Sequence, residues 1–374
     1  MIEYNDIKIS HNDKRTSYGS PYFNTFIFII LFSSLGPIFD GVRYVKYLVP
    51  VVAVLFYIRV GSMRIVIDNI TKPFLILMLF AIPFIWRSNA YGLYDMYFMF
   101  SYLLVYLLFK VPRYNVRKLG MLVACLYLLD YSNKMFSGFE FSFIESKSSI
   151  ESHQFGFVFG LFCVFFITKK DWLFSIIFLI FSILSLKRIV LFAVAVVFVV
   201  SFLPDKIKKI VFDRYMLISL VLSFVFVAYF ITTEMFDEIV IQYYGVNADY
   251  LTMGRTILYR GLFDGLFSDI LNILVGAGPG ASYEVASFSL YIVEKENIHS
   301  DILKLLYENG FLCLVVFLYV LFKPKVHSVV LINLYVTILF MTDNVISYTF
   351  VMFFYFLICY QLLYVESDKI GEVN

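Results

Sequence analysis

Two arginines and a histidine have side chains that can bind an anion and move a proton. Drawn as one helix, residues 251–271 place Arg255 in the middle of an apolar stripe and Arg260 on the opposite side. The stripe consists of Leu251, Leu258, Leu262, Leu266 and Ile270. An arginine on a packed apolar face needs an anionic partner, because burying an unpaired charge is costly. Arg255 therefore either binds an anionic substrate, or reaches lipid headgroups or pairs with a nearby carboxylate.

Arg188 ends a very tight turn, residues 185–188, between two strongly apolar runs. A planar guanidinium can bind two phosphate oxygens at once, which suits a phosphate attached to a lipid. Lys187 adds a second cation at the same turn. The alternative is that Arg188 anchors the end of a membrane span at the interface.

His299 begins a predicted helix over residues 299–308, with Asn297 or Ser300 as its N-cap. The positive end of a helix disfavours the imidazolium form, so a neutral ring is expected there. A neutral imidazole can accept a proton from a sugar hydroxyl, although a lone loop histidine often has no such role. His153 opens another apolar run and is either a boundary residue or a site residue.

The glycine cluster Gly276-Ala277-Gly278-Pro279-Gly280 predicts a tight backbone turn. It is not a dinucleotide-binding fingerprint, since no βαβ pattern surrounds it. The sequence also lacks P-loop, HExxH and GxSxG motifs. The cysteines have no CxxC spacing, which argues against disulfides and zinc. They are Cys125, Cys163, Cys313 and Cys359.

The composition indicates an integral membrane protein. The chain is 61% hydrophobic and 16% charged, with a mean hydropathy of +0.83, whereas soluble domains are about 45–50% apolar and about 25% charged. No basic tract accompanies the net charge of +2, so nucleic acid is not an expected partner. Residues 1–21 lack the pattern of a cleaved signal peptide, so the first apolar run is expected to stay as an anchor.

The predicted fold is all-α, a polytopic bundle of about twelve transmembrane helices with one large helical loop on the outer side. A span needs about 20 mainly apolar residues. The apolar runs are 22–39, 44–60, 73–86, 93–109, 119–131, 153–168, 172–186, 188–203, 215–231, 305–322, 328–342 and 345–364. Most lysines and arginines fall on the cytoplasmic side if both termini are cytoplasmic.

Three regions follow from this topology. Residues 1–231 hold the first nine spans, and residues 311–374 hold the last spans and a short cytoplasmic tail. Residues 232–310 form the outer loop and carry eleven carboxylates but only four basic side chains. This loop is the expected site of chemistry, completed by residues from the span ends.

Three blocks together resemble the O-antigen polymerase and O-antigen ligase superfamily of bacterial envelope glycosyltransferases. The blocks are Ser185–Arg188 before an apolar span, Gly254-Arg255 with Leu258-Tyr259, and Leu274–Gly280 followed by His299, Leu303, Glu308 and Gly310. The motifs cover about residues 185–310, and the topology covers nearly the whole chain. The resemblance implies a GT-C-like membrane enzyme in the bacterial inner (plasma) membrane.

The resemblance further implies that the substrate is an oligosaccharide linked to undecaprenyl diphosphate at the outer leaflet. Arg188 and Arg255 would hold the diphosphate leaving group, and His299 would deprotonate or orient the acceptor hydroxyl. Arg260, His153 and Lys187 are the further substrate-binding candidates, together with the turn glycines Gly276, Gly278 and Gly280. No metal or cofactor is expected, because the donor already carries its leaving group. The expected partners are this lipid-linked donor, membrane lipid, a chain-length regulator and a flippase.

Polymerisation of repeat units, for lipopolysaccharide or for a capsular or exopolysaccharide, is the predicted reaction. A ligase, which transfers the glycan to lipid A-core, is the alternative within the same superfamily. A transporter or flippase of the same glycan is the alternative from another class, and it predicts charged residues inside the spans.

Overall fold

The computed structural model describes residues 19–60, 65–136, 141–142, 147–148, 152–252, 254–290, 297–324 and 326–371. The regular secondary structure in these ranges is helical, apart from two strands of two residues each that pair antiparallel, β1 (Phe141–Ser142) and β2 (Lys147–Ser148). The all-α prediction is therefore confirmed.

The first third of the chain folds into five α-helices and two 3-10 helices within the described ranges. They are α1 (Gly19–Ser33), the 3-10 helix η2 (Asp40–Leu48), α2 (Val49–Val60), α3 (Lys72–Ala81), the 3-10 helix η3 (Ile82–Arg87), α4 (Ala90–Leu108) and α5 (Val116–Phe136). The helices that follow in the chain are α6 (His153–Thr168), α7 (Trp172–Leu184), α8 (Arg188–Phe202), α9 (Asp205–Val211) and α10 (Arg214–Phe230).

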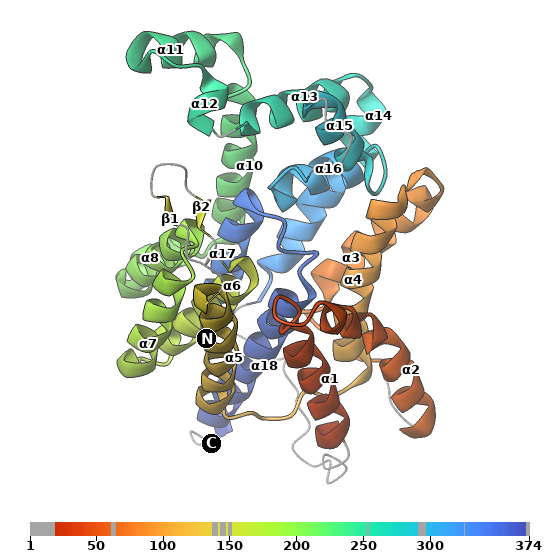
Figure 1. Cartoon of the computed structure of the whole chain (residues 1–374), viewed down its shortest axis with the longest axis vertical. Helices are drawn as coiled ribbons and strands as arrows, with labels where there is room; N and C mark the ends of the chain where they lie inside the picture. The colour runs from red at the N-terminus through yellow and green to blue at the C-terminus, as the bar shows by residue number, and fades with distance from the viewer. Residues whose placement is uncertain are drawn as a thin grey trace.

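The long polar segment folds into short helices, and three longer helices then complete the bundle. The short ones are α11 (Glu234–Tyr244), α12 (Ala248–Thr252), α13 (Arg255–Phe267), α14 (Ile270–Val275) and α15 (Ala281–Leu290). The last three helices are α16 (Asp301–Leu321), α17 (His327–Thr342) and α18 (Thr349–Gly371). Figure 1 shows α11 to α15 gathered at one end of the longest axis, beyond the bundle.

The centre of the bundle is formed by helices that are buried on every side. Residues 155–167 of α6 and 351–359 of α18 are buried throughout, and most of α17 is buried as well. A helix that is apolar all round belongs either in such a core or in a membrane. Outer helices instead expose large apolar side chains, such as Leu55 and Ile58 on α2.

Length and composition identify fewer membrane spans than the sequence predicts. In the described part of the chain, Asp40–Val60 and Asp301–Leu321 are long and apolar enough to cross a membrane. The pair α9 and α10, bent by 55°, adds a third if it is one span. Six further apolar helices have 10–17 residues. These helices indicate association with a membrane, but the predicted number of twelve spans is not confirmed.

Helix ends are set by local side chains that accept orphan backbone N–H groups. The side chain of Asn89 accepts from the Gly92 N–H at the start of α4, and Asp213 accepts from the first turn of α10. Ser300 caps α16 by accepting from the Leu303 N–H at 3.3 Å. Ser300 is thus the N-cap, one of the two residues predicted for this role.

The prediction of one continuous helix over residues 251–271 is wrong. Gly254 has a left-handed φ of +82° and separates α12 from α13, while the Asp269 side chain caps a new helix, α14. The middle of the predicted stripe is nevertheless buried, at Leu258, Leu262 and Leu266. Its ends are exposed, with Leu251 at 49% and Ile270 at 65%. The prediction failed because the apolar pattern continues past Gly254 and Asp269, where the backbone leaves the helix.

Candidate functional site

The turn between α7 and α8 lies against the junction that follows α17. Lys187 Nζ is 3.2 Å from Asp343 Oδ2, and both side chains are largely buried. Lys187 precedes Arg188, the first residue of α8, and Asp343 directly follows α17. The ion pair therefore joins two helix ends that are far apart in the sequence.

The tight turn predicted at residues 185–188 is confirmed. Leu186 adopts a left-handed φ of +56°, a conformation uncommon for a branched side chain and a sign of local constraint. The start of α6 packs against this turn. A Cβ on Gly156 would lie 2.6 Å from Ser185 Oγ, and the Ser152 N–H donates to the Ser185 carbonyl at 3.4 Å. The first turn of α6 and the first residue of α8 are thus neighbours.

Asp343 also contacts the start of α16. The Asp301 N–H donates to the Asp343 carbonyl at 3.1 Å, and the Ile346 N–H donates to Asp301 Oδ2 at 2.8 Å. The Tyr348 hydroxyl donates to Asp343 Oδ1 at 3.4 Å. Asp343 therefore connects α8, α16 and the segment before α18.

The start of α13 reaches the same region through Tyr259. Burial raises the pKa of Tyr259, the Arg255 charge opposes that shift, and Asp343 reinforces it. Arg255 and Asp343 are therefore both within electrostatic reach of the Tyr259 hydroxyl. Arg255 is the first residue of α13 and is half-buried. A cation at the positive end of a helix dipole is unfavourable unless an anion also binds there.

The starts of α6, α8 and α16 meet around the Lys187–Asp343 pair. Tyr259 brings the start of α13 within electrostatic reach of Asp343. His153, Arg188, Arg255 and His299 lie at or next to these four helix starts. Helix N-termini present free N–H groups and a partial positive charge, and they attract phosphate groups. Two guanidinium groups at two of these starts strengthen the attraction.

His299 lies immediately before the cap of α16 and its side chain is exposed. Its backbone is left-handed, with φ of +56°. Non-glycine residues with a strained backbone cluster at active sites and ligand-binding sites. Of His153, the structure describes the backbone that opens α6, and its side chain lies outside the described part. Arg188 is exposed at the start of α8.

Arg260 has a structural partner away from these helix starts. Its Nε donates to the Thr232 carbonyl at 3.1 Å, just beyond the end of α10. This hydrogen bond connects α13 to the end of α10. It gives Arg260 a structural role that requires no substrate. The two arginines of α13 thus differ: Arg255 lies at the helix start near Asp343, and Arg260 binds backbone.

The three turn glycines allow close backbone contacts, and the turn predicted for them is confirmed. Gly276, Gly278 and Gly280 have φ of +86°, +107° and +85°. A Cβ on Gly276 would lie 2.3 Å from the Glu308 carbonyl oxygen, and one on Gly280 would lie 2.2 Å from Asn89 Oδ1. Gly276 packs on the backbone of α16, Gly278 on Arg87, and Gly280 on Asn89 and the Gly92 backbone. Close packing of the turn gives these glycines a role other than substrate binding.

The turn closes on a break in α16. Gly310 has φ of +80° and ψ of +169°, values outside the helical range. The Ala277 N–H donates to the Tyr307 carbonyl at 2.8 Å, and the Gly278 N–H donates to the Glu308 carbonyl at 3.0 Å. The turn therefore satisfies carbonyls that the break deprives of helical partners.

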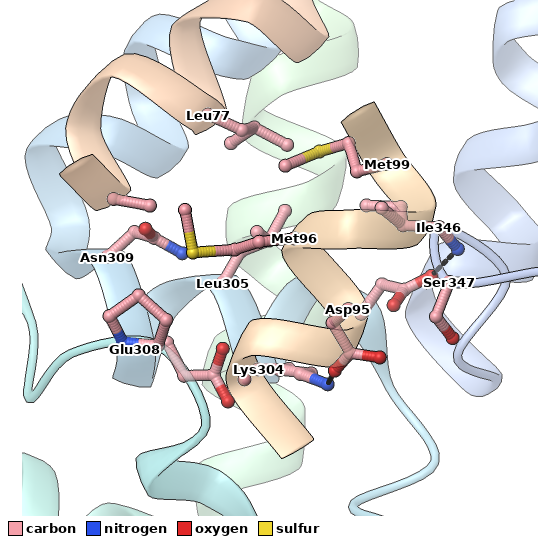
Figure 2. Close-up of a pocket in the computed structure, with 14 residues that line it drawn as sticks. Leu77, Asp95, Met96, Met99, Lys304, Leu305, Glu308, Asn309, Ile346 and Ser347 are labelled. Atoms are coloured by element: carbon pink, nitrogen blue, oxygen red, sulfur yellow. Dashed lines mark hydrogen bonds and ion pairs between the residues drawn. The ribbon is translucent and has the colours of Figure 1, made fainter. Parts of the chain in front are cut away.

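A cluster of buried charges beside this turn was not predicted. Lys304 of α16 is 6% exposed, forms an ion pair with Asp95 of α4, and donates to the Tyr283 hydroxyl at 3.2 Å. The Tyr283 hydroxyl donates to Asp95 Oδ2 at 2.8 Å. Glu308, 5% exposed, accepts from Ser282 Oγ at 2.5 Å. Figure 2 shows Asp95, Lys304 and Glu308 on one side of a pocket. The sequence offered one sign of this cluster: Asp95 is an isolated aspartate within the apolar run 93–109, and a charged residue inside a span often marks a functional site.

In the described ranges, no group of three or more His, Cys, Asp or Glu side chains is placed to hold a metal ion. No protein-family model and no curated protein sequence matches this chain.

Proposed function

We propose that this protein is a membrane glycosyltransferase that polymerises oligosaccharide repeat units carried on undecaprenyl diphosphate, at the outer leaflet of the bacterial inner membrane. One observation carries the proposal: Arg188 opens α8 beside the Lys187–Asp343 pair, and Arg255 opens α13 within electrostatic reach of the same region. Such a site suits a diphosphate, because guanidinium groups and the positive ends of helices both attract phosphate oxygens.

In the proposed reaction the acceptor hydroxyl oxygen attacks the anomeric carbon of the donor. The bond between that carbon and the diphosphate oxygen breaks, and the diphosphate leaves with the electron pair. Arg255 and Arg188 stabilise the negative charge that develops on it. His299 accepts the proton of the attacking hydroxyl, and the anomeric configuration inverts. The activated donor supplies the driving force, so the proposal includes no metal or cofactor.

The membrane topology belongs to the same proposal. Twelve spans with both termini cytoplasmic would place residues 232–310, and with them Arg255 and His299, on the outer side. The agreement of the positive residues with this orientation supports it. The six apolar helices of 10–17 residues, the two longer helices and the bent pair would supply nine of these spans. A chain-length regulator and a flippase are the proposed partners.

A transporter of the same lipid-linked glycan is the second candidate function. It is favoured by the buried Lys304–Asp95 pair and by the break at Gly310 within a helix apolar enough to span a membrane. Charged side chains beside a discontinuous helix are typical of transporter binding sites. We place it second because the helix starts around Lys187 provide groups that bind a leaving phosphate.

Deletion of the gene followed by a glycan ladder separates these functions. Loss of long chains, with single repeats still attached to core, is the result expected for a polymerase. Loss of all attachment while lipid-linked polymer accumulates would instead identify a ligase. Accumulation of single lipid-linked repeats on the cytoplasmic leaflet would identify a transporter.

A further inference from the structure

The pocket beside the buried charges has one polar and one apolar wall. The polar wall is one face of α16, where Asp301, Lys304, Leu305, Glu308 and Asn309 follow each other at helical spacing. Asp95 of α4 faces it in Figure 2. The apolar wall consists of Leu77, Ala81, Met96 and Met99. Polar groups set against an apolar surface are typical of a small-molecule site.

Most polar groups of this pocket already have partners in the protein. Asp95 is bound by Lys304 and Tyr283, Glu308 by Ser282, and Asp301 by the Ile346 N–H. Asn309 differs from them. It is 7% exposed, and its Oδ1 has no hydrogen-bond partner among the described residues. Figure 2 shows its amide at the pocket, with the nitrogen toward Met96.

A buried carbonyl oxygen without a partner is unfavourable, so this site favours a ligand that donates a hydrogen bond. The charges restrict what that ligand can be. Three carboxylates and one ammonium line the pocket, which disfavours a phosphate. The described residues include no group able to hold a metal ion. A neutral hydroxyl group satisfies both restrictions.

The size of the pocket limits the part of the ligand that enters. Its volume is about 50 Å³, room for a few water molecules. A hydroxyl-bearing edge of a sugar fits that space, with its C–H groups against Met96 and Met99. The same helix face begins at Asp301, two residues after His299. A sugar held there would lie along the helix that His299 precedes.

We propose that this pocket binds a hydroxyl-bearing edge of the acceptor sugar, with Asn309 Oδ1 accepting a hydrogen bond from it. The inference rests on the proposed glycosyltransferase function and adds an acceptor subsite to it. The diphosphate of the donor binds at the helix starts near Lys187, and the acceptor binds along α16. Asn309 is a specificity-determining residue in this account, separate from the groups that act on the leaving phosphate.

The test measures binding of the soluble repeat-unit oligosaccharide, released from the native polymer, to the purified full chain in detergent. Asn309→Leu removes the acceptor atom at similar volume, and Asn309→Ala does so without filling the space. Thr337→Val is the matched control, because Thr337 Oγ1 is also buried without a partner and Thr337 does not line the pocket. Thermal shift across a range of oligosaccharide concentrations gives the apparent Kd.

We expect wild type and Thr337→Val to bind alike and both Asn309 variants to bind about tenfold more weakly, as for one lost hydrogen bond. Asn309→Leu should melt no lower than wild type without ligand, since it removes an unsatisfied buried group. Unchanged binding in the folded Asn309 variants, or no binding by wild type, would overturn the acceptor subsite. Polymer formation by wild type from lipid-linked repeats is measured in parallel, and its absence would refute the proposed function instead.

Discussion

Lys187 and Asp343 form an ion pair, with 3.2 Å between Nζ and Oδ2, that joins the start of α8 to the end of α17. The backbone carbonyl of the same aspartate accepts from the first residue of α16, Asp301. Asp343 thus holds together two helix starts that the proposed mechanism uses. It is also an anion next to a proposed anion site, so it orients Lys187 and competes with the substrate for it.

This relationship predicts opposite effects of Asp343→Asn on stability and on donor binding. Removal of the carboxylate charge takes one ion-pair partner from the largely buried Lys187, and we expect a loss of about 1–3 kcal/mol in the free energy of unfolding. Donor affinity should rise, because the competing anion is gone. Chemical denaturation and binding of the lipid-linked repeat measure the two effects. Weaker donor binding by a folded Asp343→Asn variant would contradict this role.

His299 allows its imidazole to be tested separately from its strained backbone. At φ of +56° glycine is unstrained, whereas alanine keeps a strain of about 1–2 kcal/mol. We expect His299→Gly and His299→Ala both to lose turnover by about 10²–10⁴-fold, the usual contribution of a general base. Donor binding should persist in both variants. Wild-type turnover in His299→Gly would show that the imidazole is not the base.

The close approach of the glycine turn to α16 predicts a difference between two glycine variants. Gly276 and Gly245 both have positive φ, but a Cβ on Gly276 would meet the Glu308 carbonyl at 2.3 Å, and one on Gly245 would meet nothing within 4 Å. Gly245→Ala should cost about 1–2 kcal/mol from backbone strain. Gly276→Ala should cost roughly 2–5 kcal/mol, since overpacking adds to the strain of a backbone conformation that is essentially restricted to glycine. Equal melting temperatures for the two variants would contradict the packing of the turn on α16.

The Tyr283–Asp95 hydrogen bond predicts a sensitivity to alkaline pH. Burial raises the pKa of Tyr283, although the Lys304 charge opposes this, so the folded protein keeps a proton that the unfolded chain releases near pH ~10. The stabilising contribution is complete below that pH and is lost as pH rises through the raised folded value. We expect wild type to lose stability more steeply than Tyr283→Phe above pH ~10. Parallel curves of melting temperature against pH would contradict this.

Features that depend on neighbouring residues were predictable from the sequence. The cap at Ser300, the turn at residues 185–188 and the glycine turn follow from local backbone preferences. The helix over residues 251–271 was predicted too long, because the apolar period continued past Gly254 and Asp269, which end helices locally. Periodicity shows which face is apolar, but not where the backbone breaks.

Contacts between distant segments were not predictable in the same way. Nothing in the sequence pairs Lys187 with Asp343 or Lys304 with Asp95, because their proximity results from the packing of α8, α17, α4 and α16. Arg260 was a substrate-binding candidate from its charge alone, and its hydrogen bond to the Thr232 carbonyl appears only once α13 lies against α10. Charge identifies candidates, and tertiary packing decides which of them already have partners.

The central claim is that the helix starts bearing Arg188 and Arg255 hold a diphosphate leaving group. Its most direct test is the release of undecaprenyl diphosphate from the lipid-linked repeat by purified protein in proteoliposomes. Arg255→Ala should reduce release by at least ~100-fold, because the charge it stabilises develops in the transition state. The Arg255→Lys variant should release diphosphate at a rate between those of wild type and Arg255→Ala, since lysine cannot bind two phosphate oxygens in fixed geometry.

Arg260→Ala is the matched control on the same helix, because its partner is the Thr232 carbonyl. We expect it to melt at a lower temperature and still release diphosphate within about threefold of the wild-type rate, as for a change outside the reacting groups. Release that depends strongly on Arg255 and weakly on Arg260 is the predicted result. Equal release by wild type and Arg255→Ala, or no release by wild type, would contradict the account.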